Sequence, residues 1–213
     1  MKILFISGGS GSGKTTVCDY LEKRYNIPCI HVDDIVAEYN LGQEYISIVL
    51  AYRKYYDEIN CGNYENIISD NGIDVDVKIR LKRLIEILNN RVNEMIMNYE
   101  ASNQPYITVE FLVPSMLTCF HQSSLKIFLS KSIENRLQAL NKRIRRFAVY
   151  DLPDKELTES NLLNRDIYSF YDDFHLGNQD FDIVIENENT VESLYAEIDK
   201  IMDTFIENRI SKN

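Results

Sequence analysis

The sequence of 213 residues lacks the features that mark secreted, membrane-spanning or zinc-finger proteins. Its four cysteines, at positions 18, 29, 61 and 119, form no Cys-x-x-Cys pair, so neither a zinc motif nor a thioredoxin-like motif is indicated. Single, well-spread cysteines are typical of a reducing compartment. The apolar run at the N-terminus is only about five residues long, which is too short for a signal peptide or a membrane span. We therefore expect a cytoplasmic protein without a membrane anchor.

The chain also has fewer basic residues than acidic residues. The chain has 23 Lys and Arg residues against 33 Asp and Glu residues, which gives a formal net charge of −10. Because phosphate backbones favour basic surfaces, we do not expect non-specific binding to nucleic acid. A local basic patch could still bind a phosphorylated small molecule. The length and the hydrophobic content of 45% fit a single globular domain over residues 1–213.

Short apolar runs alternate with amphipathic stretches along the chain. The apolar runs predict five strands, at residues 2–7, 27–32, 106–113, 125–129 and 181–185. Apolar residues at steps of three and four predict helices, at residues 15–25, 44–58, 74–99, 132–146 and 190–206. Strands that alternate with helices indicate a parallel sheet with helices on both faces. The predicted fold class is therefore a three-layer α/β/α fold with a five-stranded parallel sheet.

The segment between the first strand and the first helix fits G-x-x-x-x-G-K-[ST] at every fixed position. It consists of Gly8, Gly9, Ser10, Gly11, Ser12, Gly13, Lys14 and Thr15, and Thr16 follows. Glycines let the backbone curl so that its N–H groups form an anion nest, and the helix adds its positive dipole end. Lys14 can reach the β- and γ-phosphates of ATP, and the Thr15 hydroxyl is placed to ligate Mg²⁺. The alternative is a glycine-rich turn without function. The predicted strand before the segment and the predicted helix after it argue against this alternative.

Other classes of P-loop protein find little support in the sequence. A GTPase needs an Asn-Lys-x-Asp motif after a strand, whereas Asn141-Lys142 lies in a basic helix and lacks the Asp. No Asp-x-x-Gly segment or transporter ATPase signature is present, and the chain is short for a motor protein. A small kinase is favoured.

The phosphate loop and the second strand resemble the nucleoside, nucleotide and dephospho-CoA kinase superfamily. His31–Ile35 is similar to the segment after strand two in nicotinamide riboside and uridine kinases, and Asp34–Ala37 is similar to dephospho-CoA kinases. The resemblance implies that an Asp here accepts the proton of the attacking hydroxyl, and we favour Asp33. Asp33 and Asp34 would then both face the substrate. The alternative is that one of them caps the next helix.

The third strand carries a second carboxylate. Ile107–Phe111 resembles the strand end of uridine kinases, which implies that Glu110 supports Mg²⁺ together with Thr15 and lies beside the substrate. The chain departs from the pattern of the resembled kinases at two places, because no Gly follows Glu110 and no Glu follows Leu117. A Glu in an apolar strand is costly without a partner, which favours a site role. The alternative is an edge position that faces water.

Basic residues gather on the fourth predicted helix and at its end: Arg136, Lys142, Arg143, Arg145 and Arg146. The resemblance implies a lid at residues 143–165 whose arginines close over ATP. We expect Arg143 to be catalytic and to bind the nucleotide with Arg146, because the guanidinium fork suits phosphate oxygens. The alternative is a solvated helical face paired with acidic neighbours.

The closing segment Phe181–Asn187 resembles the last strand of dephospho-CoA kinases, whose turn lies beside the adenine. Residues 41–100 occupy the place of the substrate-binding helices in these kinases. The predicted reaction is transfer of the γ-phosphoryl group of ATP to a hydroxyl of a small molecule, either dephospho-CoA or a nucleoside or nucleotide. Two alternatives remain open: a nucleotide-binding P-loop switch, and a degenerate kinase fold that serves as an interaction module.

Overall fold

The computed structural model describes residues 1–39, 75–144 and 180–207. The predicted helix at 44–58 and all but the first two residues of the predicted lid lie outside the described residues. Along the chain the described elements are β1 (Lys2–Gly8), α1 (Lys14–Tyr25), β2 (Cys29–His31), α2 (Val32–Glu38), α6 (Val75–Ala101), β3 (Tyr106–Glu110), the short 3₁₀ helix η1 (Pro114–Met116), α7 (Thr118–Gln122), β4 (Leu125–Ser130), α8 (Ile133–Ile144), β5 (Ile183–Glu186) and α10 (Val191–Glu207).

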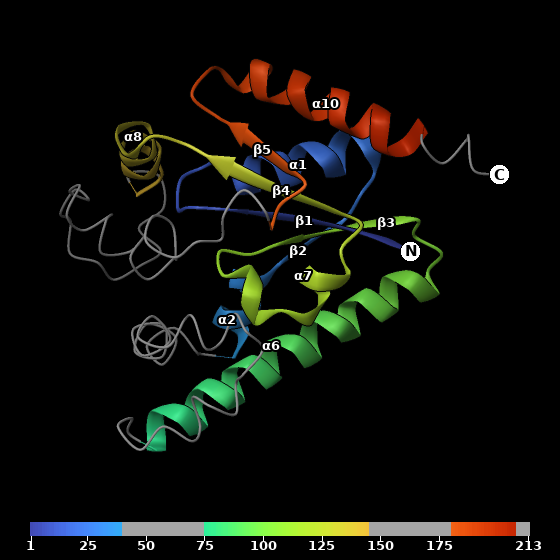
Figure 1. The fold of residues 1–213 in the computed structure, drawn as a ribbon, viewed down its shortest axis with the longest axis vertical. Helices are drawn as coiled ribbons and strands as arrows, with labels where there is room; N and C mark the ends of the chain where they lie inside the picture. The colour runs from blue at the N-terminus through green and yellow to red at the C-terminus, as the bar shows by residue number, and fades with distance from the viewer. Residues whose placement is uncertain (40–74, 145–179, 208–213) are drawn as a thin grey trace.

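The strands form one five-stranded sheet in the order β2-β3-β1-β4-β5, and every neighbouring pair is parallel. β1 lies at the centre, between β3 and β4 (Figure 1). Because all strands run the same way, their carboxyl ends meet at one edge of the sheet, where such folds bind ligands. The predicted fold class is confirmed.

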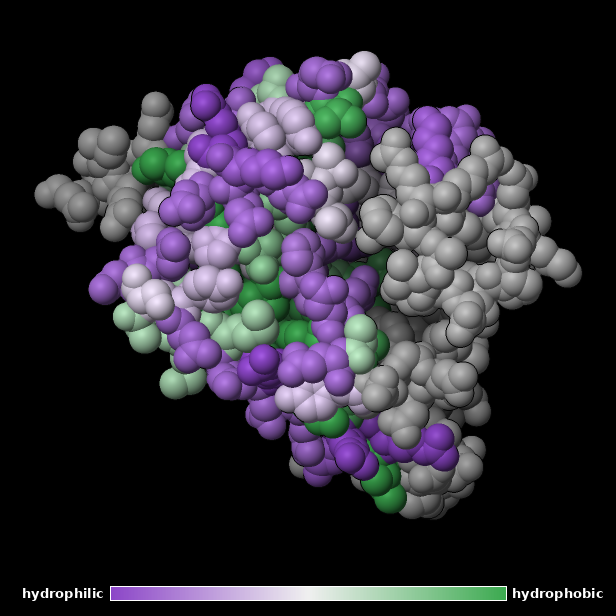
Figure 2. Space-filling view, turned by 180° about the vertical axis from the view of Figure 1, so that it is seen from behind, coloured by the Kyte–Doolittle hydropathy of each residue, from purple (hydrophilic) through white to green (hydrophobic). Residues whose placement is uncertain are grey.

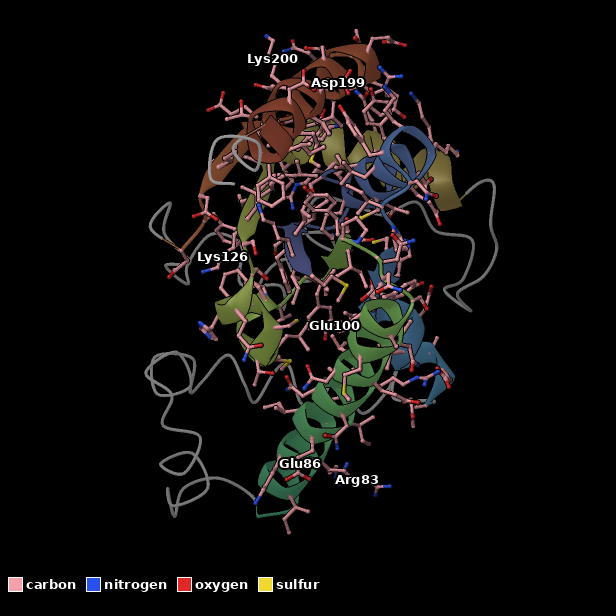
Figure 3. The ribbon with its side chains drawn as sticks, turned by 90° about the vertical axis from the view of Figure 1, so that its right-hand side faces the viewer. Arg83, Glu86, Glu100, Lys126, Asp199 and Lys200 are labelled. Atoms are coloured by element: carbon pink, nitrogen blue, oxygen red, sulfur yellow. The ribbon has the colours of Figure 1, made fainter. Side chains whose placement is uncertain are left out.

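Helices cover both faces of the sheet, and each layer has its own core. On one face, Leu21 of α1 and Ile198 of α10 pack on buried residues of β1 and β4. On the other face, Leu84, Leu88 and Val92 of α6 pack on β3 and α7. Figure 3 shows α10, with Asp199 and Lys200, on one side of the sheet and α6, with Arg83, Glu86 and Glu100, on the other. Burial of both faces explains why the strands are near-continuous apolar runs.

Element boundaries differ from the prediction at the carboxyl ends of two strands. β2 ends at His31, and Asp33 and Asp34 lie in the first turn of α2 instead of at the end of a strand. Acidic side chains are favourable at a helix N-terminus because of the helix dipole, which explains the early turn into α2. β3 ends at Glu110, and Pro114 opens η1 a few residues later.

Polar side chains dominate one face of the described residues. Figure 2 shows hydrophilic side chains over most of the coloured part of this face, with a hydrophobic group near its centre. None of the helices in the described ranges is both long enough and apolar enough to cross a membrane.

One side-chain cluster joins α1 to α10. The hydroxyls of Tyr20 and Tyr25 each donate a hydrogen bond of 2.7 Å to Oδ1 of Asp199. Tyr20 also stacks on Tyr195, with 3.9 Å between the ring centroids. The two hydroxyls hold the pKa of Asp199 below its usual value, because they stabilise the charged carboxylate.

Replacing Asp199 by Ala should lower the free energy of unfolding by about 1–2 kcal/mol, because two hydrogen bonds to a charged acceptor are lost. Urea unfolding followed by circular dichroism measures this change. Glu197→Ala is the matched control, because Glu197 is an exposed acid on the same helix. An equal loss in both variants would show that the tyrosine cluster does not stabilise the packing of α1 on α10.

Candidate functional site

The loop between β1 and α1 is built on three glycines with positive φ: Gly8 at 147°, Gly11 at 81° and Gly13 at 105°. A Cβ on Gly13 would lie 2.6 Å from Nδ2 of Asn187, and one on Gly11 would lie 3.0 Å from the carbonyl oxygen of Arg136. Both positions therefore need glycine for backbone conformation and for space.

Two later segments of the chain hold this loop in place. Nδ2 of Asn187, which follows β5, donates a hydrogen bond of 2.8 Å to the carbonyl oxygen of Ser12. Gly11 packs against the Arg136 backbone and the Leu140 side chain of α8. Within the loop, the Ser12 N–H donates to the carbonyl of Gly9 at 3.1 Å. The loop is thus fixed by elements more than a hundred residues away in sequence.

Lys14 is the first residue of α1 and is 9% exposed. Its Nζ donates to the carbonyl oxygens of Gly8, at 3.0 Å, and Gly9, at 3.4 Å, so the ammonium lies across the loop. The N-cap residue Gly13 offers no side chain to the first N–H groups of α1, and no acidic residue lies in the first turn. Those N–H groups and the helix dipole favour an anion at this point.

Glu110 ends β3 and is 7% exposed. The Thr15 hydroxyl donates to the Glu110 carboxylate and lies 3.3 Å from Oε1 and 3.4 Å from Oε2, and Nζ of Lys14 lies 3.9 Å from Oε1. On the other side, Nδ1 of His31 lies 2.5 Å from Oε2. The structure therefore brings Lys14, Thr15 and Glu110 together. The alternative of an edge position is wrong, because β3 lies between β2 and β1.

The surroundings of Glu110 and His31 favour the charged form of both side chains. Burial alone would raise the pKa of Glu110, but the hydrogen bond from His31 and the charge of Lys14 outweigh it and lower the pKa. The hydrogen bonds of His31 to Cys29 and Glu110 raise the pKa of His31 to about 11. Glu110 is therefore a carboxylate and His31 an imidazolium near neutral pH.

His31 was not predicted to be a site residue. Its partner is Glu110, 79 positions later, and the two meet because they are register partners on β2 and β3. The available signal was that each residue is a polar side chain inside a predicted apolar strand, at residues 27–32 and 106–113. Using it required the strand order, which places these two strands side by side.

The arrangement of Lys14, Thr15 and Glu110 fits Mg²⁺ and a nucleoside triphosphate. Mg²⁺ takes hard oxygen ligands at 2.0–2.1 Å, so two neighbouring ligand oxygens lie roughly 3 Å apart. The Thr15 hydroxyl and Glu110 Oε1 are 3.3 Å apart. The uncapped start of α1 and the ammonium of Lys14 match the charge of phosphate groups.

The other predicted residues occupy different positions. Asp33 and Asp34 are exposed in the first turn of α2, two and three residues after His31. The N-cap of α2 is His31, so the structure does not support capping by either Asp. Their predicted role as proton acceptor and substrate contact stays a prediction.

The predicted lid arginines lie mostly outside the described residues. Arg145 and Arg146 lie outside the described residues, and only the helical backbone of Arg143 is described. Arg136, from the same basic group, is 2% exposed, so for this residue the alternative of a solvated helical face is wrong.

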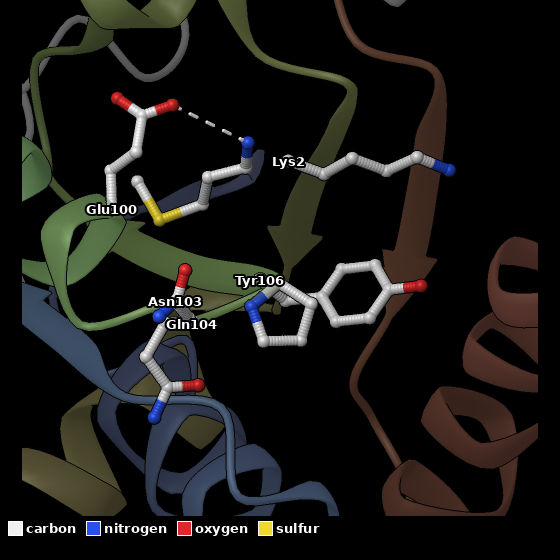
Figure 4. Close-up of a pocket in the computed structure, with 7 residues that line it drawn as sticks. Lys2, Glu100, Asn103, Gln104 and Tyr106 are labelled. Atoms are coloured by element: carbon white, nitrogen blue, oxygen red, sulfur yellow. Dashed lines mark ion pairs between the residues drawn. The ribbon is translucent and has the colours of Figure 1, made fainter.

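A pocket lies at the opposite edge of the sheet, at the start of β1 and β3 (Figure 4). Lys2, Asn103, Gln104 and Tyr106 line it, and Glu100 pairs with the N-terminal ammonium at 3.6 Å. Parallel sheets bind ligands at the carboxyl edge instead, where the phosphate loop lies. We therefore assign the candidate active site to the loop and not to this pocket.

Comparison with known proteins shows what the whole chain is similar to. No protein-family model matches the chain. Adenylate kinase 2 of Plasmodium falciparum is 25% identical over 227 aligned positions, which cover 94% of this chain and 82% of the relative.

Solved structures resemble the whole chain. Dephospho-CoA kinase from Campylobacter jejuni superposes with a TM-score of 0.53 and 15% identity, over 98% of this chain and 100% of the other. Shikimate kinase from Bacteroides thetaiotaomicron gives a TM-score of 0.52 and 14% identity, over 95% and 98%. The chain has the fold of the P-loop small-molecule kinases, and the predicted resemblance is confirmed.

Replacing His31 by Ala should lower the free energy of unfolding by about 1.5–3 kcal/mol, because the buried carboxylate of Glu110 loses a charged hydrogen-bond partner. Thermal or urea unfolding measures the change. His121→Ala is the control, because His121 is exposed on α7. A loss no larger than that of the control would contradict a stabilising pair between His31 and Glu110.

Proposed function

We propose that this protein is an ATP-dependent kinase that transfers the γ-phosphoryl group to a small molecule. The observation that supports this is the meeting of Lys14, Thr15 and Glu110 at the uncapped start of α1. The loop N–H groups and Lys14 would hold the phosphates, and Thr15 and Glu110 would hold Mg²⁺. When bound, Mg²⁺ neutralises charge that develops on the phosphoryl oxygens.

The remaining site residues would act on the acceptor and on the transferred group. Asp33 would accept the proton of an acceptor hydroxyl, since it follows β2 at the carboxyl edge of the sheet. Asp34 would contact the substrate. Arg143 and Arg146 would stabilise negative charge during transfer.

Two chemical classes of acceptor compete. The resemblance of His31–Ile35 to nucleoside kinases and of Asp34–Ala37 to dephospho-CoA kinases favours an alcohol. The relative named adenylate kinase favours a phosphate group instead. A phosphate monoester is already ionised near neutral pH and needs no general base, but a hydroxyl must lose its proton during transfer. The need for Asp33 therefore distinguishes the two classes.

An ADP-release screen tests the proposal directly. The full chain is incubated with Mg-ATP and, in turn, nucleosides, nucleoside monophosphates, shikimate and dephospho-CoA. Lys14→Ala is the blank and should reduce turnover by at least about 100-fold, because the phosphate oxygens lose their ammonium partner. One acceptor that raises turnover well above this blank supports a kinase and identifies its acceptor class.

Two other outcomes would contradict the kinase proposal. ATP binding that depends on Lys14, with no acceptor-stimulated turnover, would favour a nucleotide-binding switch. Absence of both binding and turnover would favour a degenerate kinase fold that acts as an interaction module.

With the best acceptor identified, Asp33→Asn should lower kcat by about 10²–10⁴-fold and leave ATP affinity unchanged if the acceptor is a hydroxyl. Asp34→Asn is the matched control on the same helical turn and should mainly raise the KM for the acceptor. Steady-state kinetics separate the two effects. Near-normal kcat in Asp33→Asn would mean that Asp33 is not the base, as expected for a phosphate acceptor.

A further inference from the structure

A second group of ligand atoms lies directly beside the proposed magnesium site. Cys18, Cys29, His31 and Glu110 each offer one atom, and these four atoms all lie within 4.8 Å of one another. Cys18 and Glu110 are buried, whereas Cys29 and His31 are partly exposed. The proposed kinase reaction uses neither cysteine.

The fold brings these residues together from three elements. Cys29 and His31 are two positions apart on β2, so they point to the same face of the sheet. His31 is the register partner of Glu110 on β3. Cys18 lies one helical turn after Lys14 on α1, which covers this face of the sheet. No sequence motif could reveal the group, because its members are spread over 93 positions, from 18 to 110.

The donor set is the one that Zn²⁺ prefers. Two thiolates, one imidazole nitrogen and one carboxylate oxygen complete a tetrahedral shell, whereas Mg²⁺ avoids sulfur. Sγ of Cys29 lies 4.0 Å from Nδ1 of His31. In a tetrahedral zinc site the same two atoms would be roughly 3.5 Å apart, so a small inward movement is enough. Nδ1 of His31 and Oε2 of Glu110, now hydrogen-bonded, would separate as the cation replaces their shared proton.

Charge balance favours a divalent cation at this place. The two thiolates and Glu110 would carry three negative charges, and Zn²⁺ would supply two positive charges. The ammonium of Lys14, 3.9 Å from Oε1 of Glu110, supplies the third. A buried group with no net charge avoids the desolvation cost of an isolated ion.

We propose that Cys18, Cys29, His31 and Glu110 form a binding site for Zn²⁺ or a similar soft divalent cation next to the phosphate loop. Binding there engages Oε2 of Glu110, the residue assigned above to Mg²⁺. Zn²⁺ therefore inhibits phosphoryl transfer. This inhibition depends on the proposed function, whereas cation binding does not.

Titration of the full, reduced and metal-free chain with Co²⁺ tests the site without nucleotide. Co²⁺ replaces Zn²⁺ in tetrahedral sites and is coloured. We expect a thiolate-to-cobalt charge-transfer band and intense visible bands that saturate at one equivalent and vanish when Zn²⁺ is added. Absence of the charge-transfer band, or a band that Zn²⁺ does not displace, overturns the proposal.

Matched variants assign the ligands. Cys29→Ser should weaken the charge-transfer band, and Cys18→Ala with Cys29→Ser should abolish it. Cys119→Ser is the control, because Cys119 is a buried cysteine on α7 outside the group. An unchanged band in the double variant overturns the site.

A histidine variant tests the same site even if the cysteine variants do not fold. His31→Asn should weaken Co²⁺ binding by more than about tenfold, whereas His121→Asn should leave it unchanged. Circular dichroism confirms that each variant is folded. Unchanged Co²⁺ affinity in folded His31→Asn also overturns the proposal. Zinc inhibition of ADP release is measured separately, so failure of the kinase reaction leaves the binding result intact.

Discussion

A buried carboxylate at the end of β3 fixes the relative position of three elements. Glu110 is 7% exposed and contacts α1 through Lys14 and Thr15, and β2 through His31. Because an unpaired buried charge is costly, each contact must be kept for the carboxylate to remain inside. The start of α1 and the end of β2 are therefore held against the centre of the sheet by one side chain. The candidate site is thus part of the packing of the fold.

The phosphate loop depends on a second constraint, which is the close approach of distant backbone. Gly11 lies against the backbone of α8, and Gly13 lies against Asn187, so neither position has space for a side chain. The amide of Asn187 also satisfies the carbonyl of Ser12. These contacts link the loop to β5 and α8, the two elements that flank residues 145–179. The loop and α8 are therefore in direct contact at Gly11.

Much of this arrangement could be predicted from the sequence, because its signals are local. The glycine spacing from Gly8 to Gly13 predicted the loop, and the 3–4 spacing from Leu84 to Val92 predicted α6. The helix predicted at residues 15–25 ends where α1 ends, and the next residue, Asn26, is its C-cap with φ of 55°. Prediction failed where a long-range neighbour decides the outcome. Nothing near Arg136 or His31 in sequence indicates that α8 packs on Gly11, or that β2 pairs with β3.

The two oxygens of Glu110 face chemically different surroundings. The Lys14 ammonium, which is suited to phosphate, lies near Oε1. The Thr15 hydroxyl, which is suited to Mg²⁺, lies 3.3 Å from Oε1 and 3.4 Å from Oε2. Near Oε2 lie the His31 imidazole and, beyond it, the Cys29 thiol, which are suited to softer cations. A carboxylate can bind a metal through either oxygen, but burial limits how far this one can rotate. If Glu110 binds a cation as proposed, the donors on each side of it would decide which cation it holds. The charge of the carboxylate alone cannot make that choice.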